Sequence, residues 1–127
     1  MKKELILKKC DECGALVKVI KDCDCKDCGI ICCDKNMRTI KANEVDASFE
    51  KHIPVYERKE SDVVVTVPHV MEEDHYIEWI CFVGDDREET YYLEPGMDAY
   101  VIFKNITGGT LYSYCNKHGL WEKKIDL

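Results

Sequence analysis

The residues best suited to chemistry in this chain are its histidines, together with one cysteine near its C-terminal end. All four histidines of the sequence lie in its last two thirds: His52, His69, His75 and His118. Each borders a strand-like run, and none sits in a helical apolar pattern. Cys115 precedes His118 by three residues, in Cys115-Asn116-Lys117-His118. Four imidazoles and one thiolate suit a soft-to-borderline ion, and iron fits such a mixed set best.

A second candidate metal site lies in the N-terminal segment. Of the nine cysteines in the chain, seven fall between residues 10 and 33. Cys10-x-x-Cys13-Gly14 has the spacing of a metal knuckle, in which both thiolates reach one ion and the glycine permits the tight turn. Four thiolates would give a tetrahedral site that suits zinc or iron. Two pairs compete to complete it: spacing alone favours Cys25-x-x-Cys28, and the adjacent Cys32-Cys33 is the alternative.

Composition narrows the classes of function. A length of 127 residues fits one ordinary domain, or a metal-stabilised small domain followed by a β domain. The formal net charge of -7 argues against a nucleic-acid partner, and it requires a local positive group if the substrate is an anion. There is no apolar stretch long enough for an export signal or a membrane span. We therefore expect a cytoplasmic protein whose cysteines bind metal.

The chain reads as two domains joined by a connector. Residues 1–38 are cysteine-rich and have too few apolar residues for a core of their own, so a metal must supply stability. Residues 39–48 contain no cysteine and no aromatic residue, as expected of a linker. Residues 49–127 hold short runs typical of strands, at 63–67, 76–83, 89–93, 99–103 and 110–114. Turn residues separate these runs, which predicts a mainly β fold, a small sandwich or barrel.

The N-terminal block resembles the desulforedoxin-type domain. The resemblance rests on Cys10-x-x-Cys13-Gly14, the strand-like 16–20, Cys32-Cys33, and Met37 four residues after the second of these. It implies one iron held by Cys10, Cys13, Cys32 and Cys33. The chain departs from this family in having Cys23, Cys25 and Cys28 in an insertion, and Asp34 where glycine is usual. Zinc or an iron–sulfur cluster are the alternatives for this site.

The second domain resembles the catalytic domain of the superoxide reductases, the desulfoferrodoxin and neelaredoxin family. Three motifs in order carry the resemblance: 50–55 (Glu-Lys-His-Ile-Pro-Val), 68–80 around His69 and His75, and 114–121 around Cys115 and His118. With the N-terminal block, the whole chain looks like a desulfoferrodoxin with two iron centres. The resemblance implies an immunoglobulin-like β-sandwich.

The same resemblance assigns roles to residues. It implies one iron with four equatorial imidazoles, from His52, His69, His75 and His118, and an axial thiolate from Cys115. The reaction would be the one-electron reduction of superoxide to hydrogen peroxide, with Lys51 as the positive charge that attracts superoxide and Glu50 as a ligand to the sixth position after oxidation. A rubredoxin-like protein would donate the electron, and the chain would form a homodimer.

Two other functions compete with this reading. One is an electron-transfer iron protein, similar to rubredoxin, in which the four-cysteine site transfers the electron and the β domain binds a partner. The other is a zinc-bound structural module. The histidine set distinguishes the enzyme from both, because neither a carrier nor a structural site needs an open coordination position.

Overall fold

The computed structural model of the chain describes residues 4–25, 29–44 and 49–126, and of residues 49 and 50 it describes the backbone only. Contacts between Cα atoms divide these residues into two compact units, one spanning Glu4–Lys41 and the other beginning at Ala42. The described helix is a single short turn, and it lacks the length and apolarity needed to cross a membrane. The predicted mainly β fold is confirmed.

The N-terminal unit is built from short antiparallel strands. They are β1 (Leu7–Lys9), β2 (Leu16–Lys18), β3 (Ile31–Cys32), β4 (Lys35–Asn36) and β5 (Arg38–Ile40). Strand β1 lies between β2 and β5 in one sheet, and β3 and β4 form a separate hairpin. Among the described residues of this unit, the buried apolar side chains are those of Leu7, Cys10 and Met37. So small a core cannot offset the entropy of ordering the chain, which is why this unit needs a metal.

The first unit extends past residue 38, where we expected the first domain to end, because strand β5 belongs to this unit. Its residues pair with β1 in the register Lys9↔Arg38. Of the predicted connector 39–48, residues 45–48 lie outside the described residues. Asn43, within that connector, is bound to the second unit: its N–H donates to the carbonyl of Leu120 at 2.9 Å, and its Oδ1 accepts the N–H of Glu122 at 3.0 Å.

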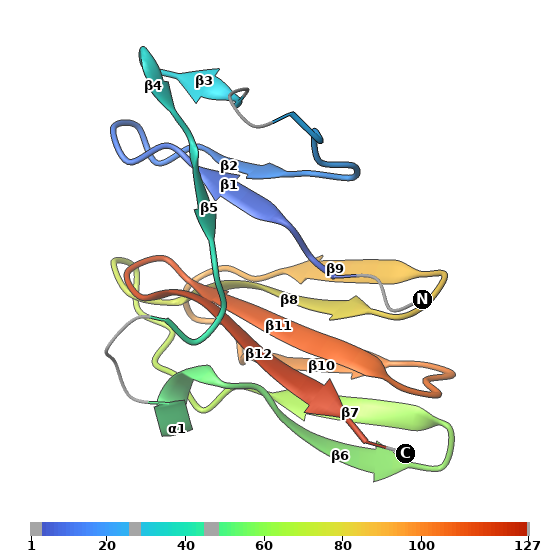
Figure 1. Cartoon of the computed structure of the whole chain (residues 1–127). Coiled ribbons are helices and arrows are strands. Elements are labelled where there is room, and N and C mark those ends of the chain that lie inside the picture. Colours follow the sequence, from blue (N-terminus) through green and yellow to red (C-terminus); the bar gives the residue numbers. More distant parts are fainter. Residues whose placement is uncertain (1–3, 26–28, 45–48, 127) are drawn as a thin grey trace. The chain divides into compact units, whose positions relative to one another are not determined.

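The second unit is a sandwich of two antiparallel sheets (Figure 1). Its elements are α1 (Phe49–His52), β6 (Val55–Lys59), β7 (Asp62–Thr66), β8 (Ile77–Val83), β9 (Glu88–Tyr92), β10 (Tyr100–Phe103), β11 (Gly109–Cys115) and β12 (Gly119–Ile125). One sheet has the order β10-β7-β6 and the other has the order β12-β11-β8-β9. The predicted immunoglobulin-like arrangement of two packed sheets is thereby confirmed.

Alternating apolar residues of both sheets fill the space between them. The three-stranded sheet contributes Val63, Val65, Val101 and Phe103, and the four-stranded sheet contributes Ile80, Phe82, Leu111 and Ile125. All of these are at most 6% exposed. This core gives the sandwich stability of its own and makes it a rigid support for the residues at its ends.

The histidines predicted to bind metal lie where strands of the sandwich end. His69 and His75 lie in the connection from β7 to β8, and His118 lies in the turn between β11 and β12. Because Cys115 at the end of β11 pairs with Ile77 at the start of β8, these two connections meet. His52 ends the one-turn helix α1, an element that the sequence did not predict because four residues are too few to show helical periodicity.

Candidate metal centres

The five side chains expected at the catalytic centre converge. One potential ligand atom from each of His52, His69, His75, Cys115 and His118 lies within 4.8 Å of all the others. His52 and Cys115 are buried, and the other three are partly exposed. The group therefore has an inner side formed by protein and an outer side near solvent.

The four imidazoles form a closed ring of neighbours. The ring centroids of His52 and His69 are 4.7 Å apart, and those of His69 and His75 are 4.5 Å apart. The ring of His118 completes the circle, at 5.1 Å from His75 and 4.9 Å from His52. Neighbouring rings meet edge to face, with interplanar angles of 67–88°. This is the arrangement that four equatorial ligands of one ion require.

The distances between donor atoms fit an ion at the centre of this ring. Adjacent octahedral ligands with metal–nitrogen bonds of about 2.1 Å lie about 3 Å apart, and His52 Nε2 is 3.1 Å from His118 Nδ1. The Sγ atom of Cys115 lies 3.4 Å from His69 Nε2 and 3.8 Å from His118 Nδ1. The thiol is thus adjacent to two of the imidazoles. The donor set suits mononuclear iron.

Two of the histidines carry features that metal binding explains. His75 Nε2 is buried and has no hydrogen-bond partner among the residues that the structure describes, a costly state unless a ligand satisfies its lone pair. His69 hydrogen-bonds through Nδ1 to the carbonyl oxygen of Val70, which fixes the tautomer with Nε2 free to coordinate. Burial lowers the pKa of His69, although the Val70 carbonyl opposes that shift. A neutral imidazole is the form that binds metal.

His52 is held from two sides. The Oγ of Ser113, a fully buried residue of β11, donates to the carbonyl oxygen of His52 at 2.6 Å. The indole of Trp121, also fully buried, stacks on the His52 ring with centroids 4.8 Å apart and an interplanar angle of 26°. Together they fix both the end of α1 and the plane of the imidazole. Trp121 ends the third sequence motif, 114–121, whereas nothing in the sequence pointed to Ser113.

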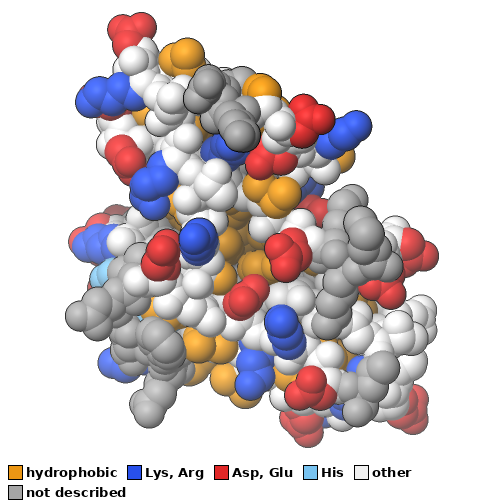
Figure 2. Space-filling view, viewed as in Figure 1, with side chains coloured by type: hydrophobic (Ala, Val, Ile, Leu, Met, Phe, Trp, Pro, Cys, Tyr) orange, Lys and Arg blue, Asp and Glu red, His pale blue; other side chains and the backbone are white. Residues whose placement is uncertain are grey.

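The two residues expected to take part in catalysis differ in how far the structure describes them. Lys51 is exposed and immediately precedes His52 in the last turn of α1. The side chain of Glu50 lies outside the described residues. On the face seen in Figure 2, the lysine and arginine side chains of the described residues are interspersed among acidic ones.

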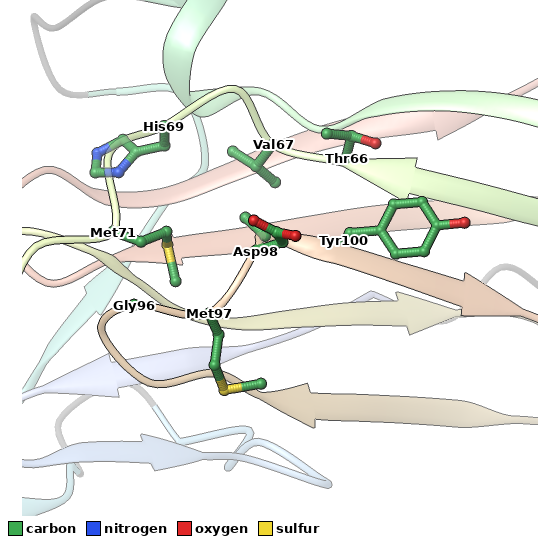
Figure 3. Close-up of a pocket in the computed structure, with 9 residues that line it drawn as sticks. Thr66, Val67, His69, Met71, Gly96, Met97, Asp98 and Tyr100 are labelled. Carbon is green, nitrogen blue, oxygen red and sulfur yellow. The ribbon is translucent and has the colours of Figure 1, made fainter.

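An open hollow of about 550 Å³ lies beside the ring of imidazoles. Figure 3 shows it between the 66–71 segment, which carries His69, and the 96–100 segment. Met71, Met97 and Tyr100 supply much of its lining. Met97 is 45% exposed and Tyr100 is 51% exposed, so both lie where the hollow opens to solvent.

A second group of potential ligands lies in the N-terminal unit. The Sγ atoms of Cys10, Cys13, Cys32 and Cys33 lie within 4.8 Å of one another. Cys13 Sγ is 3.6 Å from Cys32 Sγ, and Cys32 Sγ is 4.0 Å from Cys33 Sγ. A tetrahedral site with metal–sulfur bonds of about 2.3 Å has sulfur–sulfur edges of about 3.8 Å. These four thiols suit a tetrahedral iron site of the desulforedoxin type.

The pKa values of these thiols show what an ion would change. The backbone N–H of Cys13 lowers the pKa of Cys10 to about 7. The neighbouring thiols, Cys13 first and then Cys10, raise the pKa of Cys32 to about 12, and they also raise the pKa of Cys33. Without a cation the four sulfurs cannot all ionise together. A bound metal removes this conflict and displaces the protons.

The grouping of the four thiols shows that the ligand pair expected from spacing alone was wrong. Spacing alone favoured Cys25 with Cys28, but Cys25 is disulfide-bonded, and Cys28 lies outside the described residues. Cys32 and Cys33 lie at the knuckle instead, because β5 pairs with β1 and brings the preceding hairpin alongside. Cys23 is a free, exposed thiol outside the four-thiol group.

Ion pairs hold the hairpin against the knuckle. Lys35 Nζ lies 2.6 Å from Glu12 Oε1. The guanidinium of Arg38 makes two contacts with the carboxylate of Asp11, at 3.2 and 3.3 Å. Both pairs are exposed, so each adds little to stability, but they select this arrangement of the two segments.

The turn at Cys32-Cys33 explains why the desulforedoxin-type domain usually has glycine after its second cysteine pair. Cys33 and Asp34 have φ angles of 53° and 61° and are the two central residues between the paired Cys32 and Lys35. Such a two-residue turn needs positive φ at both positions. Aspartate tolerates the left-handed region better than most residues, so Asp34 can replace the glycine.

Replacing Gly14 by alanine is expected to weaken the four-thiol site through backbone strain alone. Gly14 has a φ of 79°, and a Cβ atom there would meet nothing within 4 Å. The left-handed conformation should cost about 1–2 kcal/mol, which corresponds to a loss of metal affinity of about five- to thirtyfold in competition with a chelator. Ala15→Gly is the control for a change of the same size one residue away. Equal affinity of Gly14→Ala and the natural chain would show that the turn can relax.

Comparison with known proteins places the chain in a family. The sequence model of the desulfoferrodoxin family matches residues 44–124. A desulfoferrodoxin of Syntrophotalea carbinolica is 36% identical over 128 residues, which cover 98% of this chain and 99% of that protein. A superoxide reductase of Pyrococcus abyssi is 33% identical over 112 residues, covering 70% of this chain and 96% of the relative.

Solved structures agree with this assignment. The crystal structure of the superoxide reductase from Treponema pallidum superimposes with a TM-score of 0.72 at 28% identity, covering 96% of this chain and 100% of that one. Both the sequence match and the fold extend over the residues that bring the four imidazoles and Cys115 together. The chain belongs to the desulfoferrodoxin family.

Proposed function

We propose that this protein is a superoxide reductase, which reduces superoxide to hydrogen peroxide with one electron and two protons. The observation that carries the proposal is the convergence of four imidazoles and one thiol on one point. The names of the relatives from Pyrococcus abyssi and Treponema pallidum agree with it. Iron bound in this site supplies the one-electron chemistry.

The ligand set explains why superoxide would react here. Five protein ligands leave one position of an octahedron open to a small molecule. Four neutral imidazoles and one thiolate leave a divalent ion with net positive charge, which attracts an anion. A thiolate from Cys115 would donate electron density to an iron held by these residues and so would favour electron transfer to the substrate. His69, His75 and His118 are partly exposed, which supports an open face on their side of the ring.

Lys51 and Glu50 complete the proposed catalytic group. Lys51 gives the approaching superoxide a local positive charge in a chain of net charge -7. Its exposure and its place next to His52 support this role. Glu50 is proposed as the residue that takes the open position once the site is oxidised, on the family resemblance alone.

The two alternative functions, an electron carrier and a structural zinc module, explain fewer features of the site. A carrier needs no open coordination position, and a structural zinc site is closed by four ligands. Five convergent donors, one of them a thiol beside a ring of imidazoles, exceed what either function uses. We therefore assign the catalytic role to the sandwich and a second iron to the four-thiol unit.

We propose that the electron comes from a small rubredoxin-like protein, and that it enters beside His69. Exposed apolar side chains nearby support this entry point: Met97 and Tyr100 at the hollow are 45% and 51% exposed, and Val70, outside its lining, is 47% exposed. Transient electron-transfer complexes use small interfaces, and fully buried apolar contacts form the centre of most interfaces.

We propose a homodimer on the family resemblance. We propose the cytoplasm as the compartment because a reducing compartment keeps the ligand thiols free.

Pulse radiolysis of the reduced, iron-loaded protein with superoxide tests this function. The expected result is a fast oxidation of the iron, followed through its visible absorption. In Lys51→Ala the second-order rate constant should fall on the order of tenfold, with a weaker dependence on ionic strength, since electrostatic steering is lost.

Lys59→Ala is the charge-matched control, because this exposed lysine lies at the opposite end of β6 from α1. It should change the rate less than twofold. Absence of the fast phase in the natural chain would overturn the proposed function. Equal rates for the two lysine variants would overturn only the role of Lys51.

A further inference from the structure

The side chain of Asn116 joins the two connections that supply the metal ligands of the sandwich. Its Oδ1 accepts a hydrogen bond from the N–H of Tyr76 at 3.0 Å, and its Nδ2 donates to the carbonyl oxygen of Asp74, also at 3.0 Å. The backbone N–H of Asn116 donates to the carbonyl oxygen of Tyr76 at 3.2 Å. One half-buried residue thus bonds to the chain on both sides of His75.

The segment around His75 has few other supports. Its own turn is closed by two backbone hydrogen bonds between Glu72 and His75, at 3.0 and 3.1 Å. Glu72, Glu73 and Asp74 are all exposed, so packing does not fix where this turn lies. The ion pair of Lys117 with Asp74 is long, at 3.9 Å, and exposed, so it contributes little.

The position of this turn decides whether His75 can complete the ring. Its Nε2 is buried and has no hydrogen-bond partner among the described residues, so no hydrogen bond of this nitrogen orients the ring. The His75 ring has to meet those of both His69 and His118. Asn116 lies between Cys115 and His118 in sequence, so it fixes the His75 turn to the very turn that carries these two ligands.

We propose that Asn116 is a positioning residue that sets His75 as the fourth imidazole of the iron site. This role of Asn116 depends on the proposed function in one respect only, namely that the bound metal is iron. Asparagine suits it because one short side chain must both accept from an N–H and donate to a carbonyl. Aspartate keeps the shape and the acceptor, but it offers no donor and places a negative charge beside the Asp74 carbonyl. Alanine removes both bonds.

Asn116→Asp and Asn116→Ala test the proposal, with Lys117→Ala as the matched control one residue away. Affinity for iron, measured by competition with a chelator, should fall about ten- to a hundredfold in both Asn116 variants, the usual cost of losing a partner that orients a ligand. Lys117→Ala should stay within twofold of the natural chain. The electron paramagnetic resonance signal of the ferric sandwich site should change in the Asn116 variants, because one equatorial ligand is displaced. The spectrum of the four-thiol unit serves as an internal reference.

The outcomes separate this proposal from the proposed function. Unchanged iron affinity and an unchanged resonance signal in Asn116→Asp would overturn the role of Asn116. If Asn116→Ala does not fold, the isosteric aspartate variant and its thermal unfolding profile decide the question. If the natural chain shows no fast reaction with superoxide, the proposed function fails. The affinity and resonance measurements would still report on Asn116.

Discussion

Replacing Cys115 by serine is expected to abolish the reaction with superoxide while leaving the sandwich folded. Cys115 is fully buried, and its Sγ lies 3.4 Å from His69 Nε2. A serine hydroxyl is a poor ligand and cannot donate electron density as a thiolate does. The rate constant should fall by about a hundredfold or more, since losing even an outer partner of a ligand costs ten- to a hundredfold. The sulfur-to-iron absorption band of the ferric site should disappear with it.

Cys81→Ser provides the control for changing a buried thiol in the same sheet. Cys81 is 1% exposed on β8 and lies outside the group of five donors. This variant should lose some stability, because a hydroxyl is buried in place of sulfur, but its rate constant should stay within about twofold. A Cys115→Ser protein that kept both the absorption band and the fast phase would exclude Cys115 as the axial ligand.

Removing the metal from the four-thiol unit is expected to unfold that unit and leave the sandwich intact. In metal-dependent small domains the binding free energy amounts to about 10 kcal/mol or more of folding free energy. The few buried apolar residues of Glu4–Lys41 cannot replace it. Cys13→Ser should therefore abolish protection of the β1 and β5 amides in hydrogen exchange, whereas β8 and β11 remain protected by their own core.

Cys23→Ser is the matched control, because Cys23 is an exposed cysteine of the same unit that lies outside the four-thiol group. It should leave the metal content and the exchange pattern as they are. Protection of β1 and β5 that survives in metal-free Cys13→Ser would mean that the strands of this unit are stable without an ion. In that case the cysteines of this unit would bind metal without being needed for its folding.

Residue types and their order in the chain were enough to predict the five potential ligands that the fold brings together. The motifs around His52, His69 and His75, and Cys115-x-x-His118, point to one iron site because few other arrangements use four imidazoles and a thiol. The strands of the sandwich were also recognisable, since their β-branched and aromatic residues are a local signal. Strands β6 and β12 and the short α1 of the sandwich were missed. The two strands are rich in charge, and the helix is too short to show a period.

Which thiols pair, and what holds the imidazoles, depended on contacts between segments distant in sequence. Spacing favoured Cys25-x-x-Cys28 and the family resemblance implied Cys32-Cys33, and the pairing of β5 with β1 brings the second pair to the knuckle. Ser113 and Asn116 act through hydrogen bonds to residues about 61 and 40–42 positions away, for which their own sequence gives no sign. The sequence by itself therefore determined the chemistry of this protein, because ligand identity is a property of side chains. Only the tertiary structure decided the geometry, because the distances between donors are set by strand register and by buried hydrogen bonds.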